Sequence, residues 1–337
     1  MAHHRVAPTR RRFLQGGIAV AGVGLLSACG LVPPFGRPAA KIPRVGMLVF
    51  YSNASALEPQ VFAFLRGMHE AGYVDGQSVV YEYRFAQERS ERLPILMAEL
   101  LNSEVDLIWT YGTPASIAAR DATSTTPVVF VGGGDPVGLG LVQSLARPGG
   151  NLTGATAFST TLNRKRLEIL KEVAPRTSHV ALLLDATSLL RTTVLDETRA
   201  AGQTLGTEIS HYEVRNPNDC IAAFQAAVSA GADGLLVQPS PIFLRLRTEI
   251  ADLARASQLP SLFADSEFAE VGGLLSYGPN AMDTYHRSAS NVDRILKGAK
   301  PADVPVTQPT EFEFVINLKT AQELGLNLSS SVMGRAA

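Results

Sequence analysis

Short apolar runs alternate with longer amphipathic segments along most of the chain. The run from Arg44 to Phe50 is almost entirely apolar, as in a strand that is buried on both faces. The segment from Gln60 to Ala71 carries its apolar residues at the spacing of a helix. Strands that alternate with such helices form right-handed βαβ units around a parallel sheet. Before residue 150 the same pattern predicts strands at Ser78–Phe85, Val105–Tyr111 and Pro127–Val131, and helices at Glu91–Asn102 and Pro114–Ala122.

A second series of the same kind begins after Asn151–Gly154. Two successive series of similar size indicate two α/β lobes, each built on a doubly wound parallel sheet. Ligands of such sheets bind outside the carboxyl ends of the strands, so the cleft between the lobes is the expected site. The second series predicts strands at His179–Leu184, Glu208–Val214, Gly234–Gln238 and Pro260–Phe263, and helices at Leu162–Val173, Thr192–Leu205, Asp219–Ala230 and Leu244–Ser257.

Composition and charge narrow the class of protein. The chain has 337 residues, which suits two lobes of about 120 to 150 residues each. Hydrophobic residues make up 46% and charged residues 18%, as in ordinary globular proteins. The 30 basic residues are balanced by 31 acidic ones, which argues against a nucleic-acid partner. Two cysteines cannot form a structural zinc site on their own.

The first 28 residues have the pattern of an export signal. Arg10–Arg12 precede Phe13 and an apolar stretch from Gly16 to Leu26, which is too short for a permanent transmembrane helix. The paired arginines followed by Phe and Leu favour the twin-arginine route, although the apolar stretch also suits an ordinary secretory signal. Removal of this segment takes away four arginines and no acidic residue, which leaves a formal charge of about −5.

A lipid anchor is expected directly after the signal. Leu26–Gly30 fits a bacterial lipobox, so we expect lipidation of Cys29, which then becomes the N-terminus. The alternative is a buried cysteine that happens to follow small residues. Residues 29–43 are then the lipidated cysteine and a Pro- and Gly-rich tether. Cys220 is left without a partner for a disulfide and is expected to be part of a helix in the core.

Signatures of common catalytic sites are missing from the sequence. It contains no GxxxxGK[ST] phosphate loop, no GxGxxG fingerprint and no GxSxG elbow. Gly132–Gly134 have the wrong spacing, and Pro136 stands where a helix should begin. The four histidines outside the signal are isolated, so surface or capping roles are expected for them. We therefore predict a binding protein without catalytic residues, cofactor or metal.

Polar loops follow the predicted strands in both series. Hydroxyl and backbone N–H groups at helix N-termini suit a ligand carboxylate, and Thr113 and Ser188 are the best candidates for this role. Aspartates in these loops could pair with a ligand amine, and aromatic residues could supply an apolar wall. The alternative is that these Ser, Thr and Asp residues only cap helices. The candidate ligand-binding residues are Tyr51, Ser52, Asn53, Thr113, Pro114, Asp135, Phe158, Asp185, Thr187, Ser188, Ser240, Asp265 and Tyr277.

Eight stretches carry a family resemblance, in a constant order from Arg44 to Leu326. They are Gly72–Gln77, Glu91–Pro94, Val105–Ala115, Gly134–Gly138, Ser144–Gly154, Gly272–Asn280, Ile295–Pro301 and Phe314–Ala321. Through them the chain resembles the ABC transporter substrate-binding proteins of the tryptophan/tyrosine-binding type, which have the type I periplasmic-binding fold. The resemblance covers nearly the whole chain after the tether.

The resemblance implies a three-stranded hinge between the lobes. Residues 44–154 and about 279–305 would form lobe 1, and residues 155–278 and about 306–328 lobe 2. An open form would capture a ligand, close around it and deliver it to an ABC permease driven by an ATPase. We expect a monomer, anchored outside the cytoplasmic membrane and without a nucleic-acid partner.

The loops around the expected cleft depart from the family pattern. Relatives that bind aromatic amino acids often carry an acidic-His-Pro segment after the first strand, where this chain has Tyr51–Ser55. An Asn-Pro pair commonly follows the first strand of the second lobe, where this chain has Asp185 and Ala186. The expected ligand is therefore small and polar or amino-acid-like, with an aromatic amino acid as one candidate. Two alternatives stay open, namely a ligand-sensing module that signals to a membrane receptor and a lipid-anchored enzyme on the same fold.

Overall fold

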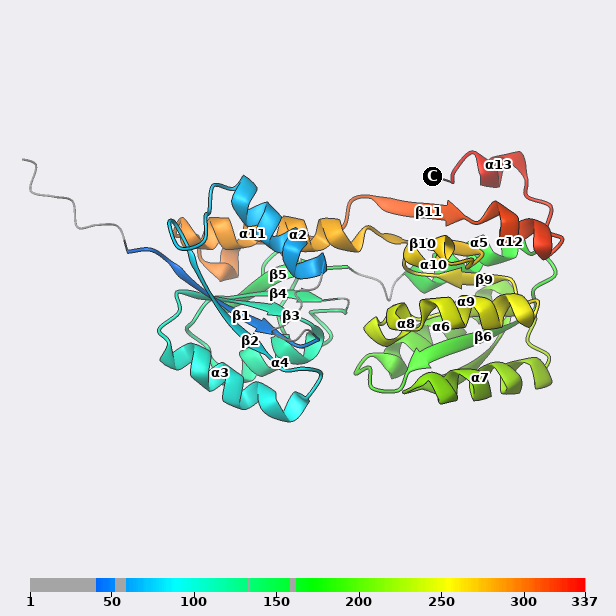
Figure 1. Cartoon of the computed structure of the whole chain (residues 1–337), viewed down its shortest axis with the longest axis horizontal. Coiled ribbons are helices and arrows are strands. Elements are labelled where there is room, and N and C mark those ends of the chain that lie inside the picture. The colour runs from blue at the N-terminus through cyan, green and yellow to red at the C-terminus, as the bar shows by residue number, and fades with distance from the viewer. Residues whose placement is uncertain (1–40, 52–58, 133, 158–161, 337) are drawn as a thin grey trace, which may run out of the picture. The chain divides into compact units, whose positions relative to one another are not determined.

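The computed structural model describes residues 41–51, 59–132, 134–157 and 162–336, which form two α/β lobes (Figure 1). The strands of the first lobe are β1 (Arg44–Val49), β2 (Val80–Phe85), β3 (Leu107–Tyr111), β4 (Val128–Gly132) and β5 (Leu152–Thr156). They form one parallel sheet in the order β2-β1-β3-β4-β5. The central strands β1 and β3 are buried almost throughout, which explains why both are apolar runs.

Helices cover both faces of this sheet. Side chains of a strand alternate between its two faces, so Met47 of β1 packs under one pair of helices and Leu48 under the other. The first pair includes a helix from late in the sequence, which lies beside α2 (Figure 1). One pair is α2 (Pro59–Glu70) with α11 (Ala281–Leu296), and the other is α3 (Leu93–Asn102) with α4 (Thr113–Ala122). Two short 3-10 turns also lie in the described part of the chain, η1 (Ser90–Arg92) and η3 (Pro301–Asp303).

The second lobe contains a six-stranded sheet. Its strands are β6 (His179–Asp185), β7 (Glu208–Val214), β8 (Gly234–Val237), β9 (Ser261–Phe263), β10 (Leu275–Pro279) and β11 (Phe312–Ile316). The order is β11-β10-β9-β8-β6-β7, and all neighbours are parallel except β10 and β11. The two lobes with doubly wound sheets confirm the expected fold class, with one antiparallel strand at the edge of the second sheet.

Two hydrophobic clusters lie on the opposite faces of this second sheet. One packs under α5, α6, α12 and α13, and the other under α7, α8, α9 and α10. Cys220 belongs to the second cluster and is fully buried, as expected from its apolar helix. These helices are α5 (Asn163–Val173), α6 (Arg191–Leu205), α7 (Pro217–Ser229), α8 (Pro241–Arg245), α9 (Arg247–Ala256), α10 (Glu267–Glu270), α12 (Leu318–Glu323) and α13 (Ser330–Met333).

One predicted helix is split in two in the structure. The expected helix Leu244–Ser257 is observed as α8 and α9, separated at Leu246. The hydroxyl of Ser240 accepts a hydrogen bond from the N–H of Ile242, and Pro241 occupies the first turn, so a new helix begins there. The early start places α8 directly after the carboxyl end of β8, among the candidate site residues.

The chain passes between the two sheets three times. It leaves the first sheet after β5, returns from β10 to α11, and crosses again between η3 and β11. Thr307 on the last crossing is held to the first, because its N–H donates to Gly154 and its carbonyl oxygen accepts from Thr156. The first and last crossings therefore run side by side where they leave the first lobe.

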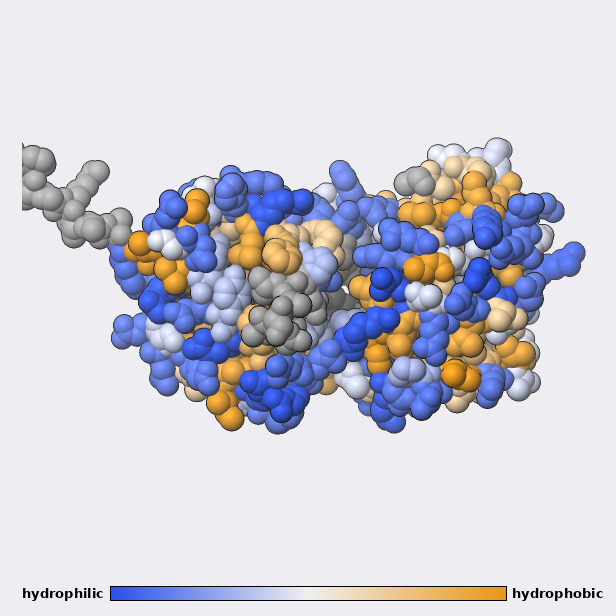
Figure 2. All heavy atoms as spheres, in the orientation of Figure 1, coloured by the Kyte–Doolittle hydropathy of each residue, from blue (hydrophilic) through white to orange (hydrophobic). Residues whose placement is uncertain are grey.

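The face of the molecule shown in Figure 2 is mostly hydrophilic, with scattered apolar groups. The large exposed apolar side chains include Phe62 on α2, Ile95 on α3, Leu189 in the loop after β6 and Leu318 on α12, so they are scattered along the chain. Single exposed apolar residues are normal in globular proteins. Among the described residues, no helix has the length and apolar character required to span a membrane.

Candidate functional site

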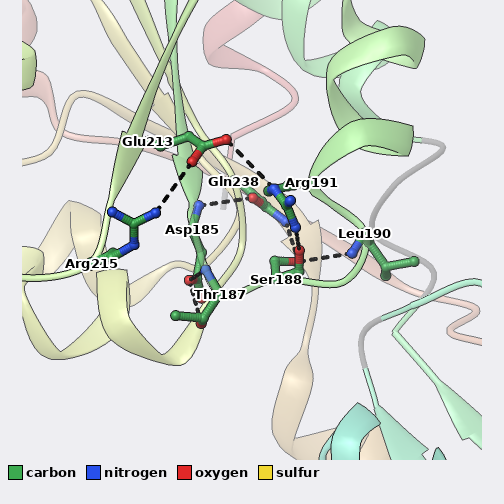
Figure 3. A network of polar contacts seen from close by, with 8 residues as sticks. All are labelled: Asp185, Thr187, Ser188, Leu190, Arg191, Glu213, Arg215 and Gln238. Carbon is green, nitrogen blue, oxygen red and sulfur yellow. Dashed lines mark hydrogen bonds and ion pairs between the residues drawn. The ribbon is translucent and has the colours of Figure 1, made fainter.

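The carboxyl ends of β6 and β8 carry a network of polar side chains (Figure 3). Asp185, the last residue of β6, is buried, and its Oδ1 accepts from the N–H and the hydroxyl of Thr187 at 2.8 and 2.6 Å. Its Oδ2 accepts from the hydroxyl of Ser240 at 2.5 Å. The carboxylate therefore positions two hydroxyls that the sequence had placed separately after two strands.

Gln238 joins the same network and was not predicted as a site residue. Its side chain is buried, its Oε1 accepts from the backbone N–H of Asp185 at 3.1 Å, and its Nε2 donates to the hydroxyl oxygen of Ser188 at 3.2 Å. The pattern had assigned Gln238 to the end of a strand, and its position at the carboxyl end was the one signal for a site role.

A chain of three charged side chains begins beside Ser188 and continues through Glu213 to Arg215 (Figure 3). Arg191 donates to the carbonyl oxygen of Ser188 at 3.3 Å, and its Nε lies 3.6 Å from Glu213. Arg215 approaches the other oxygen of Glu213 at 4.0 Å. The guanidinium of Arg191 is partly exposed, which leaves a cation within reach of an anionic group near Ser188.

A second group of candidate residues surrounds the buried Arg166. Its Nε donates to the carbonyl oxygen of Tyr277 on β10 at 2.9 Å, and its Nη1 donates to Asn163 at 3.0 Å. Burial lowers the pKa of Arg166 to about 10, against the opposing effect of Asp265. Burial and then the charge of Glu267 raise the pKa of Asp265 to about 6, although Arg166 opposes the shift. The helical pattern gave no signal that Arg166 would point into the core.

Aromatic rings gather at the carboxyl ends of β1 and β3. The ring of Tyr51 lies 5.3 Å from that of Tyr111 and 5.0 Å from that of Phe50. Tyr285 of α11 packs edge-on against Tyr111 at 5.2 Å. Gly112 follows β3 with a φ of 100°, and a Cβ there would lie 2.9 Å from the Tyr51 ring, so only glycine fits. Tyr51 was predicted here, whereas Tyr111 and Tyr285 were not.

The other candidates in the first lobe have local roles. Thr113 and Pro114 begin α4, and the hydroxyl of Thr113 lies beside Gly132 at the end of β4. Asp135 accepts from the N–H of Val137 at 2.9 Å, so its carboxylate stabilises its own turn. The predicted residues Ser52, Asn53 and Phe158, and the lipidation residue Cys29, lie outside the described residues.

The described part of the chain contains no group of three or more His, Cys, Asp or Glu residues that could hold a metal ion. Three of the histidines instead contact polar side chains of neighbouring elements. His179 contacts Ser210, His286 contacts Glu70, and His211 contacts Arg199.

Side chains from the two lobes also contact each other. Arg245, the last residue of α8, donates through both terminal nitrogens to the carboxylate of Glu88, at 2.8 and 3.2 Å. The N–H of Glu88 is held in turn by the carbonyl oxygen of Phe50, next to the aromatic rings. Burial, followed by the charge of Asp135, raises the pKa of Glu197 on α6. The pair of Glu88 and Arg245 therefore connects the loop after β2 with the end of α8.

Two α/β lobes whose strand ends carry buried polar networks and aromatic rings define a solute-binding protein. The family model for ABC transporter substrate binding protein matches residues 44–337, so this chain belongs to that family. Membership supports the prediction of a ligand-binding protein rather than an enzyme. The family works outside the cytoplasm and implies a small-molecule ligand and an ABC permease as partners.

Known proteins of similar sequence and structure agree with this assignment. The chain is 23% identical over 274 residues to the tyrosine-binding protein of Clostridioides difficile, which covers 80% of this chain and 77% of the relative. An ABC domain from Streptococcus pneumoniae in complex with L-Trp has a TM-score of 0.78 at 26% identity and covers 88% of this chain and 98% of its own. A conserved domain protein from Vibrio cholerae has a TM-score of 0.79 at 23% identity, covers 88% of this chain and 99% of its own, and shows the shared fold.

Proposed function

We propose that this chain is the solute-binding lipoprotein of an ABC importer. It takes up a small polar or amino-acid-like ligand between its two lobes, closes around it at the hinge and delivers it to the permease. The observation that carries the proposal is the pairing of two kinds of groups at the strand ends. Hydroxyls fixed by Asp185 and Gln238 stand in one lobe, and the rings of Tyr51 and Tyr111 stand in the other.

An amino acid matches these groups best. Its carboxylate suits the hydroxyl and cation beside Ser188, its ammonium suits the carboxylate of Asp265, and its side chain suits an aromatic wall. The tyrosine-binding relative and the structure bound to L-Trp favour an aromatic amino acid as the first ligand to test. The altered loops after β1 and β6 favour testing other amino acids beside these two.

The remaining parts of the proposal concern export and organisation. Residues 1–28 are proposed as a twin-arginine signal, Cys29 as the lipid attachment site, and residues 29–43 as the tether. Lobe 1 then consists of residues 44–154 and about 279–305, and lobe 2 of residues 155–278 and about 306–328. The mature protein is proposed to act as a monomer on the outer side of the cytoplasmic membrane.

A thermal-shift screen tests the proposed ligand class. The panel contains amino acids, nucleosides, sugars and small carboxylates, added to the protein after unfolding and refolding to remove any co-purified ligand. A ligand at a hundredfold excess over its Kd stabilises the folded state by about 2.7 kcal/mol, which gives a clear rise in Tm. A rise with one or more amino acids supports the proposal. A rise confined to sugars or nucleosides would overturn the ligand class.

A further inference from the structure

We propose that Gln238 is a positioning residue for the ligand, because it fixes the hydroxyl of Ser188 as a hydrogen-bond donor to a ligand carboxylate. This inference rests on the proposed function and deepens it, since it assigns a specific chemical role to one corner of the site. Gln238 lies behind Ser188 and acts through it.

The orientation of the Gln238 amide is fixed by its partner on β6. A backbone N–H can only donate, so the Oε1 of Gln238 must face the N–H of Asp185, at 3.1 Å. The Nε2 then faces Ser188, to whose hydroxyl oxygen it donates at 3.2 Å. The side chain is only 5% exposed, so a flip of the amide would leave a buried N–H without its acceptor. Gln238 is therefore a fixed donor toward Ser188.

The hydroxyl oxygen of Ser188 accepts two hydrogen bonds. One comes from the Nε2 of Gln238 and the other from the N–H of Leu190, both at 3.2 Å (Figure 3). A serine hydroxyl has two acceptor positions and one proton to donate. Both acceptor positions are filled, and no acceptor for the proton is found among the described residues. Ser188 is only partly buried, so its proton is available to an acceptor that the ligand supplies.

The two neighbouring hydroxyls differ from that of Ser188, because their protons already have an acceptor within the protein. Thr187 and Ser240 both donate their protons to Asp185, at 2.6 and 2.5 Å. Their oxygens therefore face other groups only as acceptors, and that of Ser240 already accepts from the N–H of Ile242. Ser188 is thus the hydroxyl of this network that can donate to a ligand.

The charge around Ser188 favours an anionic acceptor. Arg191 donates to the carbonyl oxygen of Ser188, and its guanidinium is partly exposed. The 15-residue helix α6 begins at Arg191, so the partial positive charge of its N-terminus adds to that of the guanidinium. Glu213 lies on the far side of Arg191 at 3.6 Å and offsets only part of this charge. A carboxylate oxygen of the ligand can accept the proton of Ser188 and is attracted by the positive charge of Arg191.

The test is a double-mutant cycle of Gln238→Glu and Ser188→Ala, read by calorimetric titration with L-tyrosine and L-tryptophan at pH 8. An ionised Glu at position 238 still accepts from the N–H of Asp185, but its second oxygen accepts the Ser188 proton and turns it away from the ligand. Each single variant should bind the better of the two amino acids about 10- to 100-fold more weakly. The double variant should bind no more weakly than the weaker single variant, because both changes remove the same donor.

A ligand control separates this role from a structural one. Tyramine and tryptamine lack the carboxylate, so the two substitutions should change their affinity by less than about twofold. Gln238→Met has a similar volume and replaces Gln238→Glu if the latter fails to fold. Multiplicative losses in the cycle, or equal losses for the amine probes, would overturn the inference. Failure of the wild-type protein to bind any amino acid of the thermal-shift panel would overturn the proposed ligand class together with the inference, whereas wild-type binding without the expected losses would overturn the inference alone.

Discussion

Among the candidate ligand contacts, Asp265 has the pKa that the folded structure changes most clearly. Burial and the nearby Glu267 raise its pKa to about 6, in spite of the attraction of Arg166. In an unfolded chain an aspartate titrates near 4. The folded protein therefore holds this proton more tightly than the unfolded chain does. The contribution of Asp265 to stability is fully present below about pH 4 and is lost as the pH rises through about 6.

The substitution Asp265→Asn should therefore have a pH-dependent effect on stability. The neutral amide avoids burial of a charge, so it should raise the Tm relative to wild type at pH 7.5. At pH 4 the wild-type carboxyl is protonated, and the gain should largely disappear. Scanning calorimetry at the two pH values measures the difference. Asp121→Asn, at an exposed aspartate, is the matched control and should show no such trend. A difference in Tm that is the same at both pH values would contradict the assigned pKa.

The residues of the site differ in how far the sequence could predict them. Asp185, Ser188 and Ser240 could be predicted because each lies at or within three residues of the end of a strand, and strand ends meet at one edge of a sheet. Gln238 and Arg166 could not, because their roles depend on partners from other elements. A buried arginine and a surface arginine look alike in a helical pattern, and only the packing of α5 against β10 distinguishes them.

At the scale of elements, the close approach of α2 and α11 holds the first lobe together. A Cβ at Gly67 would overlap the carbonyl oxygen of His286 and lie 2.9 Å from the Cβ of Ala289. The helices can approach this closely because residue 67 has no side chain. α11 comes from late in the sequence, so this contact attaches it to the N-terminal half of the chain.

Gly67→Ala should lower the free energy of unfolding by about 1–3 kcal/mol, since a backbone group must move to make room. Urea denaturation followed by circular dichroism measures the loss. Gly150→Ala is the matched control, because a Cβ there meets nothing within 4 Å, and it should unfold near the wild-type midpoint. An unchanged midpoint for Gly67→Ala would show that the two helices pack less tightly than described.

The alternation of apolar runs and amphipathic segments predicted most strands and helices of both sheets. It could do so because strands covered on both faces become continuous apolar runs. It did not separate α8 from α9, since both carry one continuous helical pattern and no side chain caps α9 at the break, Leu246. It also gave no direction for β11, whose antiparallel pairing follows from the path of the chain between lobes.

At the scale of the whole molecule, the ion pair of Glu88 and Arg245 connects the two lobes. Both side chains are about half exposed, so the pair contributes at most about 1 kcal/mol. Its two hydrogen bonds nevertheless require the loop after β2 and the end of α8 to be close together. Under the proposed mechanism, ligand binding brings the lobes together, and the ion pair should favour that state.

Glu88→Gln and Arg245→Gln should therefore each weaken ligand binding, by up to about fivefold. Wild-type affinity should fall when NaCl is raised from 50 to 500 mM, and the variants should depend less on salt. Titration calorimetry measures both effects. Glu99→Gln removes an ion pair with Arg84 inside the first lobe and should leave affinity unchanged. Equal effects of Glu99→Gln and Glu88→Gln would contradict a role for the interlobe pair.

The most direct test of the account is small-angle X-ray scattering on the protein, with and without a saturating amount of the ligand that gives the largest thermal shift. Capture between two hinged lobes predicts a smaller radius of gyration in the bound protein, with an unchanged molecular mass. A radius of gyration that stays the same at saturation would contradict closure of the lobes around the ligand.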